Sequence, residues 1–158
     1  MKNVKYFIQF CLIIFSFLIF KILGPGLSSK VSGKIFELIG PFFRSKRVIH
    51  SNIKRGIYNI NTKNLQNITN LMWNNYGRLF AEYMFIKDFR NGRLSNNIQI
   101  DGQEILDEIK KSNKQVIFVS GHFSNFELMA MYLEKTGIKL STIYRPLNNF
   151  FLVFFYFI

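Results

Sequence analysis

The chain has 158 residues, a formal net charge of +12 and a hydrophobic fraction of 49%. This length allows one domain with a buried core, and the basic excess indicates an anionic neighbour, with the hydrophobicity favouring phospholipid over nucleic acid. The single cysteine, Cys11, excludes a disulfide framework and a cysteine metal cluster, and we interpret it as a small apolar residue.

The first feature along the chain is an almost continuous apolar stretch over residues 6–23. At 1.5 Å per residue, its roughly 18 residues reach about 27 Å, close to the thickness of a bilayer core. Lys2 and Lys5 before it also fit a signal peptide, but no small-x-small cleavage motif follows, so we interpret residues 1–25 as an uncleaved, single-pass anchor. Because lysines and arginines are more numerous after the stretch than before it, we expect the remaining chain on the cytoplasmic face.

A helical region follows the anchor. The Gly-Pro-Gly sequence at 24–26 predicts a break in the helix. The spacing of apolar residues then predicts helices over residues 29–40, 48–57 and 65–86. We expect the aromatic residues of the third helix to pack in a core, although basic, aromatic helices of this kind also lie on lipid headgroups.

From residue 98 the pattern changes to short apolar runs that alternate with helical segments. It predicts strands over 98–100, 115–120 and 138–144, and helices over 104–111 and 124–136, the last ended by Gly137. Strand, helix and strand in this order predict a parallel βαβ unit. The predicted fold class is therefore α/β, with an N-terminal transmembrane helix and a helical segment followed by the first part of a βαβ sheet.

The most informative motif, S-G-H-F-S-N-F-E over residues 120–127, lies where the second of these strands should turn into a helix. Ligands of parallel sheets bind at the carboxyl ends of strands, and His122 beside Glu127 has the chemistry of a general base. Gly121 lets the backbone pass close to a ligand. Arg145, at the end of the next predicted strand, offers a guanidinium to a phosphate or a developing oxyanion.

Structural alternatives exist for the same residues. Ser124-x-x-Glu127 is a capping-box pattern, in which Glu127 caps a helix, His122 is a turn residue and Arg145 is a solvated charge. One histidine and one glutamate supply only two metal ligands, so the motif predicts no metal site. Ser120 is not part of a G-x-S-x-G elbow, which argues against a serine nucleophile.

The sequence G-H-x-x-N-x-E over residues 121–127, followed by Y-R-P-x-N over residues 144–148, resembles the late acyltransferases of lipid A biosynthesis. These lauroyl- and myristoyl-transferases belong to the wider lysophospholipid acyltransferase superfamily, and the resemblance covers nearly all of residues 1–149. It implies transfer of an acyl chain from acyl carrier protein to a hydroxyl of a lipid A precursor, without a cofactor, at the bacterial inner membrane. His122 would take the hydroxyl proton, and Glu127 would orient the imidazole. The substrate-binding residues that it implies are Gly121, Asn125, Arg145 and Asn148.

The chain also departs from this family, whose members are nearly twice as long. On the resemblance, residues 26–158 are the N-terminal part of an acyltransferase domain that lacks its C-terminal half. Residues 150–158 are apolar without a period, which we interpret as a truncation, so we expect the chain alone to be unstable or inactive. Two alternatives stay open: an acyltransferase acting on glycerolipids or lysophospholipids, whose members usually carry Asp at the position of Glu127, and a non-catalytic membrane-bound remnant that binds anionic lipid.

Overall fold

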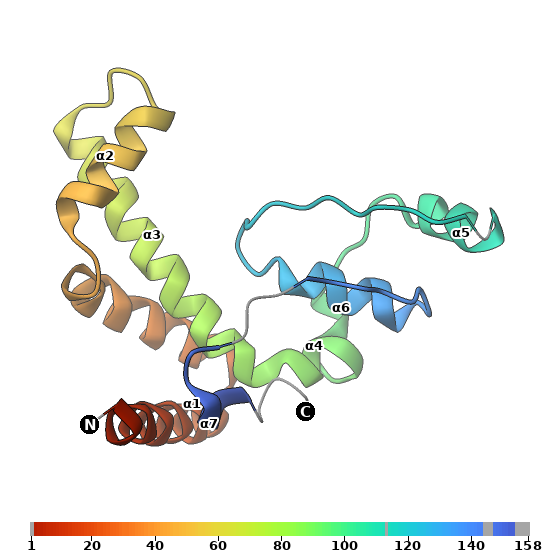
Figure 1. The fold of residues 1–158 in the computed structure, drawn as a ribbon, viewed down its shortest axis with the longest axis horizontal. Coiled ribbons are helices and arrows are strands. Elements are labelled where there is room, and N and C mark those ends of the chain that lie inside the picture. Colours follow the sequence, from red (N-terminus) through yellow and green to blue (C-terminus); the bar gives the residue numbers. More distant parts are fainter. Residues whose placement is uncertain (1, 113, 144–146, 154–158) are drawn as a thin grey trace. The chain divides into compact units, whose positions relative to one another are not determined.

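The computed structural model describes residues 2–112, 114–143 and 147–153. These residues form two units. The first comprises the described residues up to Met84 together with residues 147–153, and the second comprises Phe85–Ile143. The regular elements of the described residues are helices (Figure 1).

The first unit begins with the long helix α1 (Lys2–Ile39), which is kinked at Gly24. Gly24 has φ 74° and ψ 169°, a conformation that glycine adopts without strain, and Pro25 has no N–H to continue the hydrogen bonding of the first half. The predicted break at residues 24–26 is therefore confirmed. Figure 1 shows the two halves of α1 running in different directions.

The second half of α1, together with η1 (Gly40–Phe42), α2 (Lys46–Gly56) and α3 (Thr62–Glu82), confirms the helical region predicted between residues 29 and 86, with shifted ends. Helix α7 (Phe150–Val153) also belongs to this unit. Helix α3 begins at an N-cap, Asn61, whose side chain accepts a hydrogen bond from the Asn64 N–H (2.8 Å). It ends at Glu82, and η2 (Tyr83–Phe85) follows where the sequence predicted continued helix.

Helices α1 and α3 pack together closely and run antiparallel, since Ser32 lies against Gly77 and Gly40 lies against Trp73. The Ser32 hydroxyl donates a hydrogen bond to the Gly77 carbonyl (2.6 Å) in a buried position. A Cβ atom at residue 77 would stand 2.3 Å from the Ser32 carbonyl oxygen, so this approach requires glycine. The core of the unit is therefore built on small residues as much as on large ones.

Phe80 of α3 contacts both halves of α1. Its ring centroid lies 5.4 Å from that of Phe17 before the kink and 5.5 Å from that of Phe36 after it. The ring of Phe20, also before the kink, lies 5.8 Å from that of Phe80 and completes the cluster. Aromatic pairs at such distances stabilise a structure beyond the area that they bury. This cluster therefore stabilises the angle between the two halves of α1.

Helix α7 packs on the first turns of α1. The Asn149 side chain, which precedes α7, donates a hydrogen bond to the Tyr6 carbonyl (2.9 Å). The ring of Phe151 lies 5.6 Å from Phe7 and 5.7 Å from Phe10. Residues that are far apart in the chain therefore form one aromatic cluster at the N-terminal end of α1.

The second unit contains α4 (Ile86–Asn91), η3 (Ser95–Asn97), α5 (Gln103–Ser112) and α6 (Glu127–Lys135). An ion pair between Arg90 and Glu134 joins α4 to α6, and Tyr132 of α6 donates a hydrogen bond to Gln103 of α5 (2.7 Å). Gly137 has φ 88°, and its N–H bonds the Glu134 carbonyl (2.9 Å), which confirms the predicted end of the last helix.

The predicted α/β fold class is wrong for the residues that the structure describes. They contain no strand, and residues 98–100, 114–123 and 138–143 are irregular or extended without sheet pairing. Ile117 is 91% exposed, although the apolar run around it was predicted to be a buried strand. A helix satisfies its backbone hydrogen bonds within its own segment, whereas a strand forms only beside a partner, and an apolar run does not specify that partner.

Among the described residues, one helix, over Lys2–Phe42, is long and apolar enough to cross a membrane. Only 6% of its 18-residue apolar window is buried in the protein. The core helix of a soluble protein has the same composition but is mostly covered by other elements. The exposed apolar side chains of this helix are therefore suited to contact with lipid.

Candidate functional site

The predicted motif forms the junction between an extended segment, residues 114–123, and helix α6. The Phe123 N–H bonds the Gly121 carbonyl (2.8 Å), and Ser124 has φ 45°, so the chain turns sharply over these residues. The N–H of Leu128 then donates to the Asn125 carbonyl (3.1 Å) as the helix begins. This turn holds residues 121–127 in one compact junction.

His122 lies on the exposed side of this turn. Its ring contacts that of Phe126, with centroids 4.3 Å apart and planes inclined by 58°. The aromatic contact limits how the imidazole turns, while its exposure leaves it accessible to a substrate. A general base must reach the hydroxyl that it deprotonates, and this position allows it.

Glu127 is the first residue of α6 and is partly buried. The N-cap position belongs to Phe126, which makes no side-chain capping bond, so the capping-box alternative with Ser124 as N-cap is wrong. The first turn of a helix has unpaired N–H groups and a partial positive charge, which favour a carboxylate there. Glu127 is thus a favourably placed acid at the end of the same turn that carries His122.

Two phenylalanines of the motif, which sequence reasoning did not single out, shape this turn. A Cβ atom at Gly121 would lie 2.4 Å from the Phe123 ring, so glycine allows Phe123 to fold back over the turn. Phe126 provides the aromatic contact to His122. The sequence signal for both is their position: Phe123 directly follows His122, and Phe126 directly precedes Glu127.

The structure brings four of the six predicted site residues into this junction: Gly121, His122, Asn125 and Glu127. Arg145 lies outside the described residues. Asn148 is exposed and belongs to the first unit, whose position relative to the junction is not defined. In the described part of the chain, no group of three or more His, Cys, Asp or Glu side chains is arranged to hold a metal ion.

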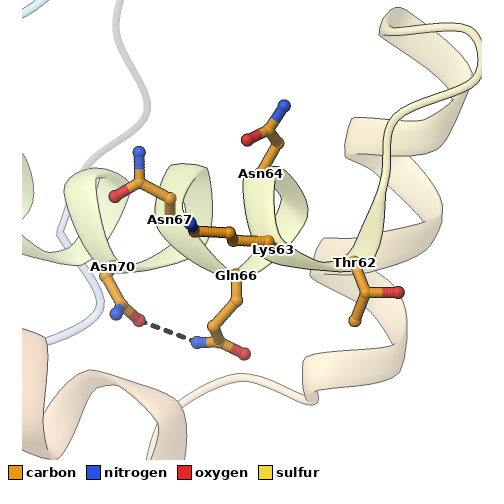
Figure 2. Close-up of a pocket in the computed structure, with 6 residues that line it drawn as sticks. All are labelled: Thr62, Lys63, Asn64, Gln66, Asn67 and Asn70. Carbon is orange, nitrogen blue, oxygen red and sulfur yellow. Dashed lines mark hydrogen bonds between the residues drawn. The ribbon is translucent and has the colours of Figure 1, made fainter.

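A surface depression of about 660 Å³ lies in the first unit, along the first turns of α3 (Figure 2). Its polar lining comes from one helix, and one pair of side chains in it, Gln66 and Asn70, is joined by a hydrogen bond of 2.8 Å. The lining residues are Thr62, Lys63, Asn64, Gln66, Asn67 and Asn70. This lining contains one ionisable side chain, Lys63, and no histidine or carboxylate to act with it, so we place the candidate site at the histidine junction instead.

Comparison with protein families gives one match. The family model described as "Bacterial lipid A biosynthesis acyltransferase" matches residues 1–153. Neither the curated proteins nor the solved structures give a match to the chain. The family match covers the apolar helix, the α1–α3 pair and the histidine junction in one continuous alignment, and the chain therefore belongs to the bacterial lipid A biosynthesis acyltransferase family.

Proposed function

We propose that this chain transfers a fatty acyl group from acyl carrier protein to a hydroxyl of a lipid A precursor. Family membership supports acyltransferase activity in general. The observation that carries the proposal is the exposed His122, which lies in a tight turn directly before α6, the helix that begins at Glu127. The net charge of +12 suits both an acidic carrier protein and anionic lipid.

In the proposed reaction His122 removes the proton of the acceptor hydroxyl as its oxygen attacks the thioester carbonyl carbon. A tetrahedral oxyanion forms and then collapses, with cleavage of the carbon–sulfur bond. The leaving thiolate takes the proton back from the imidazolium, so the products are an ester and a free thiol. Glu127 acts as a positioning residue that orients the imidazole and stabilises its cationic form. Arg145 binds a phosphate of the substrate or stabilises the oxyanion, and Gly121, Asn125 and Asn148 complete the substrate contacts.

The test uses the purified full chain with acyl carrier protein thioester and a lipid A precursor, and follows the ester product by mass spectrometry. His122→Ala should lower turnover by about 10²- to 10⁴-fold without loss of helix, since the side chain is exposed. Glu127→Gln should lower turnover less and alter its pH profile. Glu104→Gln, at the first turn of α5, is the matched control and should leave both unchanged. Turnover that is the same in wild type and His122→Ala would refute the assignment.

We expect turnover of the chain alone to be low, because the second unit has little core. Among its described residues, Phe85 and Leu133 are the buried apolar side chains, while Ile117 and Val119 are exposed. Segments with few buried contacts open easily, so amides of residues 114–123 should exchange rapidly. If wild-type chain gives no ester with the lipid A precursor, lysophosphatidic acid as acceptor tests the glycerolipid alternative. No ester with either acceptor favours a non-catalytic lipid binder.

For location, we propose that residues 1–25 anchor the chain in the bacterial inner membrane and that residues 26–158 form the acyltransferase part on its cytoplasmic face. The exposure of the apolar window and the basic residues that follow it support this topology. The hydrogen bond between Asn149 and Tyr6 favours a second arrangement. Tyr6 lies about 26 Å along the helix from Leu23, so a crossing helix would put it on the far side of the bilayer from Asn149. A first half of α1 that stays inside one leaflet would keep the two residues together. Labelling with a membrane-impermeant maleimide, added outside the cell, distinguishes the two arrangements. The variant is Asn3→Cys in a Cys11→Ala background. A helix that crosses the membrane exposes residue 3 to the reagent, whereas a helix inside the cytoplasmic leaflet does not.

A further inference from the structure

The second half of α1 and the following turn present an apolar face that no other described element covers. The exposed fractions of its side chains run from 36% for Val31 to 88% for Phe42. At about 100° per residue, the four positions in α1 fall within roughly 80° of the helix circumference, and Phe42 follows in η1. We call this face the apolar stripe; its residues are Leu27, Val31, Ile35, Leu38 and Phe42.

The other faces of the same helix explain why the stripe stays exposed. Gly33 and Gly40, which lie on the opposite face by the same geometry, are buried against Asn74 and Trp73 of α3. Ser28 and Ser32, on the flank between the two faces, are also buried, and Ser32 bonds α3 directly. Lys30 and Lys34 lie along one border of the stripe, by the same helical geometry. Lys34 also forms an ion pair with Glu37 on this side of the helix (3.0 Å). A narrow apolar face with lysines on its border is typical of helices that lie in the plane of a membrane, since lysine stems cover apolar surface while their ammonium groups stay at the polar boundary.

The charge beyond the stripe identifies the surface that it fits. Residues 38–81 contain seven lysines and arginines and no aspartate or glutamate. Phe43, next to the stripe, is also largely exposed and is followed by Arg44. A basic, aromatic surface of this kind is complementary to anionic headgroups. It is not complementary to a second copy of this chain, which would bring an equally basic surface against it.

We propose that the apolar stripe lies in the headgroup–acyl boundary of an anionic phospholipid leaflet, so that the second half of α1 lies along the membrane after the kink at Gly24. This inference rests on the proposed membrane attachment of the first half and adds a second, separate lipid contact. The kink, supported by the Phe80 cluster, allows one helix to supply both contacts. The arrangement would hold the α1–α3 pair at the membrane surface, with the Phe80 end of α3 beside the anchor.

Site-directed spin labelling of the full chain tests this. Leu38→Cys labels the stripe, and Leu71→Cys is the matched control, since Leu71 is an exposed leucine of α3 outside the stripe. Both are made in a Cys11→Ala background and reconstituted in vesicles of phosphatidylcholine with or without phosphatidylglycerol. The depth of each spin label in the bilayer is obtained from its collision rates with two reagents. These are oxygen, which concentrates in lipid, and a nickel chelate, which stays in water. Fluorescence of Trp73, in the α1–α3 contact, checks the fold, and Ile35→Cys replaces Leu38→Cys if that variant is disturbed.

We expect a several-fold higher ratio of oxygen to nickel collisions at residue 38 than at residue 71, and a larger difference with phosphatidylglycerol. Equal ratios in a chain that floats with the vesicles would overturn the proposal and leave the anchor intact. Spin–spin broadening at residue 38 would overturn it in favour of a second copy. A chain that does not float would contradict both membrane contacts. Acyl transfer is measured in a separate assay. A chain without acyltransferase activity can still give the expected depth at residue 38, so the two proposals fail independently.

Discussion

The contact between α1 and α3 yields a sharp prediction at Gly77. Replacing a helical glycine by alanine ordinarily stabilises a helix by about 1 kcal/mol. At residue 77 the new Cβ would stand 2.3 Å from the Ser32 carbonyl oxygen and 2.8 Å from the Phe36 Cβ. Because the nearest atom belongs to backbone, a side-chain rotation cannot relieve the clash, and the two helices must separate.

The expected size of the effect follows from three contributions. Overpacking costs about 1–3 kcal/mol. Separation of the helices also breaks the buried Ser32–Gly77 hydrogen bond, worth about 1 kcal/mol. After the gain in helix propensity, Gly77→Ala should lower the free energy of unfolding by about 2 kcal/mol. For a chain of this size, that corresponds to a melting temperature lower by about 4–8 °C.

The chain provides both a probe and a control for this measurement. Trp73 is the only tryptophan and lies in the α1–α3 contact against Gly40, so its fluorescence during thermal unfolding in detergent reports on this interface. The control is Gly56→Ala, at the end of α2, where an added Cβ meets no atom within 4 Å. We expect the control to melt at or above the wild-type temperature. If Gly77→Ala melted with the control, the close helix contact would be wrong.

Three further predictions concern smaller effects. Ser32→Ala should cost about 1 kcal/mol by the same fluorescence melt, because it leaves the buried Gly77 carbonyl without that donor. Gly137→Ala should cost about 1–2 kcal/mol, seen as faster amide exchange in α6, because φ of 88° is strained for alanine; unchanged exchange would contradict the cap. Arg90→Ala should cost less than about 1 kcal/mol, since both side chains of its ion pair with Glu134 are about half exposed to solvent; a larger loss of α6 protection from amide exchange would contradict this.

The sequence alone was enough to locate most of the longer helices, with ends shifted by a few residues. The break at Gly24 and the end of α6 at Gly137 follow from the backbone freedom of glycine, which is a local property. Helices α2, α3 and α5 follow from apolar spacing, because a helix forms its hydrogen bonds within the segment that carries the pattern. His122 and Glu127 are only five residues apart, so their nearness along the chain is also a local property, with His122 in the turn and Glu127 at the start of α6.

Only the tertiary structure decided which segments lie side by side. The run around Ile117 has the composition of a strand, but pairing depends on a distant partner, and none of the described residues pairs with it. The Ser32–Gly77 contact, the packing of α7 on Tyr6 and the exposure of the apolar stripe are equally non-local. Spacing along a helix shows that a face is apolar, whereas the packing of the other elements decides whether protein covers that face or leaves it to lipid.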